Sequence, residues 1–348
     1  MDRKLLIPAL MLIAVSVHAI DINKYYSDLD GKAGNNLIDA IKNTISSHTV
    51  LSYNDVRADR SGVDYNAQGY VWDMYSNCSF QKSDYCTGTD FNDCDCYNRE
   101  HSLPKSWWGS SQSEPMYTDL HHVIPTDGNA NTQRSAWAFD NVKSVKWSNS
   151  AGAKQGTGMH ISGDVFEVPD QYKGDFARIY FYMITCYNNK NFCQGGKGSQ
   201  YFTYSGGRAG FTNVAANILL LWANGDPVSD KEINRNNKVY NKQGNRNPFV
   251  DLPDLYDYIW GTKKGKVYHL PTALDDVEEQ YTYTVTTEGL TLNVSTTEEN
   301  NMLAVYNMLG QVIYMQPVGV QQTRIEVPQA GIYLVRVGNQ AKKVQVAY

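Results

Sequence analysis

The spacing of apolar residues divides the chain into two parts. In residues 20–262 many apolar positions recur at intervals of three and four, which is typical of helices with one buried face. The segments that we expect to be helical are residues 21–50, residues 172–187, residues 211–224 and a segment that starts near residue 230, after the capping pair Ser229 and Glu232. Residues 68–75 predict a short strand. This part should be a mainly helical domain around a small sheet.

Residues 281–348 instead alternate between apolar and polar positions and are rich in β-branched and aromatic side chains. The segments with this pattern are residues 281–286, 290–294, 303–307, 311–315, 323–327, 331–337 and 342–348. Seven short strands separated by turn residues indicate a small all-β, immunoglobulin-like sandwich. Residues 263–280 are polar and irregular and predict a linker. The fold class we expect is therefore α+β, in two domains.

Residues 1–19 have the composition of a secretory signal peptide. Arg3 and Lys4 precede an apolar segment, and Val17-His18-Ala19 fits a small-residue cleavage site. No later segment approaches the roughly 18 consecutive apolar residues of a membrane span. We expect the mature protein to be soluble and exported.

The cysteines agree with export. There are six, and an even number in an exported chain favours disulfide bonds. Cys186 and Cys193 would close a short local loop. The remaining four would form two more bonds, whose pairing the spacing leaves open: Cys78, Cys86, Cys94 and Cys96. The alternative is a zinc site on Cys94 and Cys96, which is weaker because no second thiol pair has zinc-finger spacing.

The charge of the chain limits how it could bind nucleic acid. The net charge is −5, so binding cannot depend on an overall positive field and would need a local patch. The best local cluster consists of Lys231, Arg235, Lys238, Lys242 and Arg246. This cluster is either a phosphate-binding surface or the solvated face of a helix.

Two segments contain the residue types of a hydrolytic site. Residues 98–104 read NREHSLP and residues 119–134 read DLHHVIPTDGNANTQR. They place Glu100, His101, Asn131 and Arg134 within a short stretch of chain. Carboxylate and amide oxygens are ligands of hard divalent cations, an imidazole can accept a proton from water near pH 7, and an arginine can hold a phosphate. Metal, base and anion clamp are the parts that metal-assisted phosphodiester hydrolysis requires.

The spacing of these residues also predicts a local fold. Adjacent residues of a strand point to opposite faces, so Glu100 and His101 can share a site only where the strand ends or bends, which Pro104 favours. Asn131 and Arg134 are three residues apart and would lie on one face of a helix. A hairpin followed by a helix, with a cation between them, is a ββα-metal arrangement.

These segments resemble the endonuclease I family of secreted bacterial nucleases, a branch of the ββα-metal nucleases. Two later blocks strengthen the resemblance: FEVPDQYKGDFARIYFYM at residues 166–183, and residues 219–253, in which QGNRNPF is the most distinctive piece. The resemblance covers roughly residues 22–262. It implies a nuclease domain over residues 20–262.

The resemblance also implies roles for individual residues. Glu100 and Asn131 would bind one Mg²⁺, with Ca²⁺ and Mn²⁺ as alternatives, and His101 would be the general base. Some members carry a phosphate-binding arginine in an insertion that this chain lacks. Arg134 is our replacement, with Arg99 and Lys105 as further possibilities. We expect supporting roles for Arg99, Asp119, His121 and Arg246, in which His121 orients the loop before Asn131.

The segments VYNMLGQVIY and AGIYLVRV in residues 281–348 resemble the C-terminal sorting domain of type IX secretion cargo in Bacteroidetes. That resemblance implies export through the type IX secretion machinery to the cell surface or the medium. The alternative is an immunoglobulin-like module that binds substrate.

The function we expect is a secreted, monomeric, metal-dependent endonuclease without sequence specificity, acting on DNA and RNA. Two alternatives remain at this point: a non-catalytic surface protein that binds extracellular DNA, and a phosphodiesterase for a small substrate.

Overall fold

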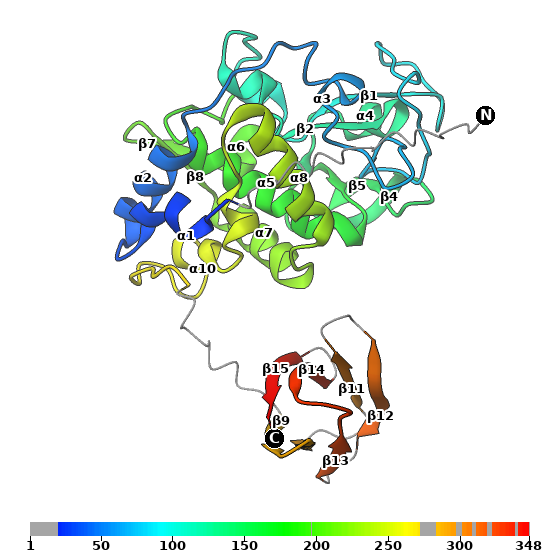
Figure 1. Cartoon of the computed structure of the whole chain (residues 1–348). Helices are drawn as coiled ribbons and strands as arrows, with labels where there is room; N and C mark the ends of the chain where they lie inside the picture. The colour runs from blue at the N-terminus through cyan, green and yellow to red at the C-terminus, as the bar shows by residue number, and fades with distance from the viewer. Residues whose placement is uncertain are drawn as a thin grey trace, which may run out of the picture. The chain divides into compact units, whose positions relative to one another are not determined.

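The computed structural model describes residues 20–195, 197–271, 283–296, 301–307, 311–318, 322–337 and 340–347. The chain divides into two compact units, Met1–Leu270 and Pro271–Tyr348 (Figure 1). The predicted signal peptide and residues 272–280 of the predicted linker lie outside the described residues. No helix in the described part of the chain has the length and apolar character needed to cross a membrane.

The helices of the first unit surround α5 (Figure 1). Their bounds are α1 Ile22–Tyr25, α2 Gly34–Ile45, α3 Ala58–Ser61, α4 Gly128–Arg134, α5 Lys173–Cys186, α6 Gly198–Tyr201, α7 Asn213–Gly225, α8 Asp230–Gln243, α9 Pro248–Asp251 and α10 Leu255–Ile259. Residues Gly174–Cys186 of α5 are all buried, and α5 contacts α2, α7 and α9. The predicted helices over residues 172–187, over residues 211–224 and from residue 230 are confirmed, the last with the capping box of Ser229 and Glu232. The helix expected over residues 21–50 is interrupted, because the chain turns between α1 and α2 and α2 ends at Ile45.

The described part of the first unit also contains three sheets. β1 (Tyr97–His101) pairs with β2 (Val123–Asp127), and β7 (Phe202–Ser205) pairs with β8 (Arg208–Phe211). The third sheet has the order β3-β6-β5-β4, with bounds Ala138–Phe139, Asp164–Glu167, Lys154–Gly158 and Val142–Ser148. This four-stranded sheet was not predicted, because β3, β5 and β6 are short and β4 is largely exposed.

Two local predictions are wrong. Residues 68–75 do not form a strand: Val71 makes single bridges to Tyr65 and Phe80, and the Asp73 carboxylate then turns the chain by accepting from the Tyr75 amide (2.7 Å). The first unit also continues beyond the predicted boundary at residue 262. Tyr268 is buried and bridges to Lys32, so the last residues before Leu270 belong to the first unit.

The cysteines pair in part as expected. Two disulfides, Cys78–Cys94 and Cys86–Cys96, tie down the loop before β1 and exclude a zinc site on Cys94 and Cys96. The predicted bond between Cys186 and Cys193 is wrong, because both are free. Cys186 ends α5 inside the core, whereas the Cys193 sulfur faces the Phe202 carbonyl.

The second unit is all-β in its described residues, as predicted. Its strands are β9 Tyr283–Glu288, β10 Thr291–Thr296, β11 Asn301–Asn307, β12 Val312–Val318, β13 Thr323–Glu326, β14 Gly331–Val337 and β15 Gln340–Val346. They form the antiparallel sheets β13-β10-β9 and β12-β11-β14-β15. Apolar residues from both sheets, such as Leu292 and Val335, share one core.

Candidate active site

The site is built on β1, β2 and α4. β1 and β2 are antiparallel, with Glu100 opposite Ile124 and His101 opposite Val123. α4 starts immediately after β2 because Asp127, the last residue of β2, caps it by accepting from the Ala130 amide (2.8 Å). α4 therefore contacts both strands.

A cleft of about 580 Å³ opens beside this unit. Glu100 and His101 at the end of β1, and Asn131 on α4, all line it. The structure thus brings these three predicted residues to one solvent-accessible space. Two basic side chains, Arg99 and Lys105, and two aromatic side chains, Tyr53 and Tyr85, also line the cleft.

Glu100 lies at the buried base of the cleft. Its Oε1 accepts a hydrogen bond from the Tyr75 hydroxyl (3.1 Å) and pairs with Arg134 Nε (2.9 Å). Burial raises the pKa of Glu100 to about 7, although the charge of Arg134 and the hydroxyl of Tyr75 oppose this rise. A bound cation would favour the ionised carboxylate.

Arg134 does not fit the predicted role of phosphate clamp. Its side chain has no exposed surface, and besides Glu100 it donates to the carbonyl oxygens of Ser102 (2.6 Å) and Ser135 (2.9 Å). The last turn of α4 points it into the core, where its Cζ lies 4.7 Å from the Phe139 ring centre. Arg134 instead compensates the buried charge of Glu100.

His101 is held in one orientation by the backbone. Its Nε2 lies 2.9 Å from the Tyr117 carbonyl oxygen, which can only accept, so Nε2 carries the proton and Nδ1 keeps its lone pair. Burial, followed by the nearby His122, lowers the pKa of His101 well below its usual value. The imidazole is therefore neutral near pH 7, which is the state that a general base requires.

Asn131 is oriented by its amide group. The Nδ2 donates to Asn98 Oδ1 (2.6 Å) and to the Arg99 carbonyl (3.3 Å). Both amide hydrogens are thus engaged, and the side-chain oxygen is the atom left to accept a ligand. An amide oxygen and a carboxylate in one cleft match the oxygen ligands that hard divalent cations prefer.

The basic cluster on and after α8 is not a free phosphate-binding surface. Lys231 pairs with Asp175 (2.6 Å) and Arg235 pairs with Asp64 (2.6 Å). Arg246, predicted to have a supporting role, makes a two-pronged ion pair with Asp251 (2.6 Å at each contact). These pairs neutralise three of the five cations of the cluster, and Lys238 donates to the Val63 carbonyl (3.1 Å). Arg246 therefore stabilises the fold and does not line the cleft.

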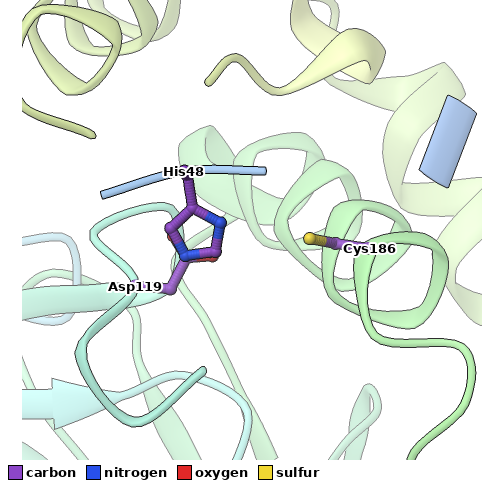
Figure 2. A group of neighbouring side chains, drawn as sticks. All are labelled: His48, Asp119 and Cys186. Carbon is purple, nitrogen blue, oxygen red and sulfur yellow. The ribbon is translucent and has the colours of Figure 1, made fainter. Parts of the chain in front are cut away.

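Asp119 and His121 belong to a second buried polar cluster (Figure 2). The Asp119 carboxylate accepts from the Tyr182 and Tyr187 hydroxyls (2.7 Å each), from Gln243 Nε2 (2.9 Å) and from the His121 amide (2.9 Å). Although burial alone would raise it, these bonds and the neighbouring histidines lower the pKa of Asp119.

Figure 2 shows His48 and Cys186 beside Asp119, and their ligand-type atoms lie within 4.8 Å of one another. The oxygens of Asp119 already accept four hydrogen bonds. The cluster therefore has a structural role: it connects the loop before β2 to α5 and α8. His121 takes part in it, with Nε2 3.3 Å from the Asn245 carbonyl.

The sequence did not reveal several aromatic residues around the site. Tyr75, whose hydroxyl donates to Glu100, lies 25 residues before it in the sequence. Tyr117, whose carbonyl oxygen holds His101, lies 16 residues after it. Tyr53 stacks near His101, with ring centres 6.1 Å apart. A chain with 25 tyrosines offers no local signal that singles these out.

Comparisons with known proteins now identify the family. Residues 33–254 match the family described as Endonuclease I. The chain belongs to the endonuclease I family. Membership confirms the predicted resemblance, makes the protein a nuclease and implies use of a divalent metal.

Curated relatives agree with this assignment. Over 254 residues the chain is 33% identical to the "Extracellular ribonuclease" of Bacillus subtilis (strain 168), covering 72% of this chain and 83% of that protein. It is 34% identical to the protein of the same name from Bacillus amyloliquefaciens, covering 71% and 81%. A more distant relative is the "Endonuclease-1" of Buchnera aphidicola subsp. Baizongia pistaciae (strain Bp), 22% identical over 59% of this chain and 85% of that protein.

Proposed function

We propose that this member of the endonuclease I family is a secreted, monomeric, metal-dependent endonuclease without sequence specificity, which hydrolyses DNA and RNA. The observation that carries the proposal is the state of His101. Its Nε2–H is fixed by a backbone carbonyl, and its Nδ1 is neutral and available in a cleft that also contains Glu100 and Asn131.

In this proposal His101 is the general base. The hydrogen bond to the Tyr117 carbonyl prevents rotation of the ring, so Nδ1 stays directed at one position in the cleft. There it takes a proton from the attacking water. General-base catalysis of this kind contributes roughly 10²–10⁴-fold to a rate.

The residues present fit a divalent cation, Mg²⁺ first and Ca²⁺ or Mn²⁺ as alternatives. Glu100 and Asn131 would hold it in a ββα-metal arrangement through a carboxylate oxygen and the amide oxygen, which has no partner among the residues that the structure describes. When bound, the cation supplies charge neutralisation of the scissile phosphate and of the leaving oxygen. Arg134 keeps the Glu100 side chain in place.

The proposed breadth of substrates has two supports. The chemistry needs a phosphodiester and no particular base, and contacts to phosphate carry no sequence information. Relatives in the family are named both as ribonucleases and as an endonuclease. We therefore propose that both DNA and RNA are cleaved.

We also propose that the protein is exported. Residues 1–19 have the pattern of a signal peptide, and two relatives carry the word extracellular in their names. The seven described strands of the second unit are compatible with the proposed type IX sorting domain, which would direct the protein to the cell surface or the medium.

Incubation of the purified protein with supercoiled plasmid and with a long RNA tests the proposal. We expect nicking and then fragmentation of both in Mg²⁺, no cleavage in EDTA, and recovery when Mg²⁺ is returned in excess. Retention of intact DNA in Mg²⁺, Mn²⁺ and Ca²⁺ alike would support the non-catalytic alternative. Cleavage of a small chromogenic phosphodiester but not of plasmid would support the small-substrate alternative.

A further inference from the structure

Arg99 differs from the other arginines that the sequence analysis named for the site or the basic cluster. In the described part of the chain it lies within ion-pair distance of no carboxylate, whereas Arg134, Arg235 and Arg246 each have one. It also lines the cleft, immediately before Glu100. A cation that no acidic side chain neutralises is available to an anionic ligand.

The position of Arg99 relates it to His101. The two are separated by one residue on β1, so their side chains leave the same face of the strand, roughly 6.7 Å apart along it. The Tyr53 ring is a neighbour of both, with the Arg99 Cζ 3.4 Å from its centre and the His101 ring centre 6.1 Å away. Arg99 thus lies one strand repeat from the general base.

Aromatic stacking fixes the guanidinium of Arg99 in place. Its Cζ is 3.4 Å from the Tyr53 ring centre and 5.5 Å from that of Tyr85, and one N–H donates to the Tyr53 carbonyl oxygen. The Nε is buried and has no acceptor among the described residues. The Nη2 group has no acceptor among the described residues, and its N–H donors can bind phosphate oxygens.

A matched arginine lies in the same stack. The Cζ of Arg57 lies 3.9 Å from the Tyr85 ring centre, but Arg57 is paired with Asp59 through two hydrogen bonds (3.0 and 2.9 Å). Arg57 is also not among the residues that line the cleft. Both arginines stack on a tyrosine ring, but only Arg57 of the two is paired with a carboxylate in the described part of the chain.

We propose that Arg99 binds the phosphate adjacent to the scissile one, so that the enzyme recognises a polynucleotide chain rather than an isolated phosphodiester. This inference rests on the proposed function, because it takes His101 to mark the scissile phosphate. Phosphate oxygens would supply the acceptors that the Arg99 donors lack, and a charge-assisted bond of this kind stabilises the complex more than a neutral one.

Binding of an uncleaved strand tests the role of Arg99 directly. The background is His101→Ala, which preserves the cleft, and the probe is a labelled single-stranded oligonucleotide followed by fluorescence anisotropy at several salt concentrations. Adding Arg99→Gln should weaken binding about tenfold at low salt and reduce the salt dependence of log Kd by about 0.7, the value of one phosphate contact on a single strand. Arg99→Lys should restore most of the salt dependence, and Arg57→Gln should change neither quantity.

Unchanged affinity and salt dependence in a folded Arg99→Gln variant would overturn the inference. A second measurement needs no variant of the protein. The unsubstituted enzyme should cleave a trinucleotide at least tenfold more efficiently than a dinucleoside monophosphate, and a neutral methylphosphonate at the neighbouring position should remove that advantage. Equal kcat/KM on all three would contradict the proposal.

Failure of this inference can be told apart from failure of the proposed function. If the unsubstituted protein cleaves neither plasmid nor RNA in any divalent cation, the proposed function itself fails. If it cleaves both while Arg99→Gln binds as tightly as its parent, only the role of Arg99 is lost.

Discussion

The first unit contains two polar clusters made of the same kinds of side chain. One joins Glu100, His101 and Asn131 in the cleft. The other joins Asp119, His48 and Cys186 inside the core (Figure 2). Both contain a carboxylate and an imidazole, but the first borders a solvent-accessible cleft, whereas the side chains of His48 and Asp119 are buried.

The clusters differ in the number of atoms left free to react. The Asp119 carboxylate accepts four hydrogen bonds, and the His48 Nδ1 lies 3.1 Å from the Ser46 carbonyl. In the cleft, by contrast, the His101 Nδ1 and the Asn131 side-chain oxygen have no partner among the described residues. Residue type alone therefore does not identify a reactive site. A carboxylate whose oxygens are all hydrogen-bonded stabilises the fold, whereas atoms without a hydrogen-bond partner can bind a metal or accept a proton.

Removing the histidine from each cluster should separate these roles most strongly. We expect His101→Ala to lower kcat about 10²–10⁴-fold with little change in Tm, because it removes the base and leaves the packing of β1 intact. His48→Ala should lower Tm and leave kcat per folded molecule within about twofold. Plasmid nicking and thermal unfolding followed by circular dichroism measure the two effects. A His101→Ala variant with unaltered kcat would remove the basis of the comparison.

The next effect in size concerns the charge beneath the cleft. Arg134→Met should lower the free energy of unfolding by about 3–5 kcal/mol, because it leaves Glu100 buried without a compensating charge. The double variant Arg134→Met with Glu100→Gln should be less destabilised than the sum of the single variants. Urea unfolding of the four proteins measures this coupling. Strict additivity would show that Arg134 does not compensate Glu100.

The smallest expected effect is a pH dependence of the free energy of unfolding, caused by His121 in the cluster around Asp119. Burial lowers the pKa of His121 to about 4, although Asp119 opposes this, whereas in the unfolded chain the pKa is near 6.5. Between these values the unfolded state binds the extra proton, so stability is complete above about pH 6.5 and declines as the pH falls to 4.

The contribution of His121 over this range should be of the order of 1–3 kcal/mol. Urea unfolding at pH 7 and pH 4.5 measures it, and His121→Gln should reduce the difference between the two. His122 and His101, whose pKa values burial also lowers, should contribute in the same direction, whereas Glu100, whose pKa burial raises to about 7, should contribute in the opposite direction. An identical pH dependence in His121→Gln would assign the effect to other groups.

Much of the fold could be predicted from local pattern. The apolar spacing of α2, α5 and α7, and the capping pair of α8, are signals contained within one segment. The alternation in the second unit predicted strands close to those observed. The sheet β3-β6-β5-β4 could not be predicted in this way, because β3, β5 and β6 are short and β3 pairs with β6, with β4 and β5 between them in the sequence.

For the candidate site, too, some features follow from local sequence and others from distant contacts. The sequence by itself determined the residues that we propose for the chemistry, Glu100, His101 and Asn131, because their types and spacing match a hairpin followed by a helix. Only the tertiary structure decided which basic side chains are free: it buries Arg134 against Glu100 and stacks Arg99 on Tyr53 with no acidic partner in the described part of the chain. Spacing along a chain can specify which face of an element a side chain leaves, but charge compensation depends on which distant carboxylate folding brings within reach.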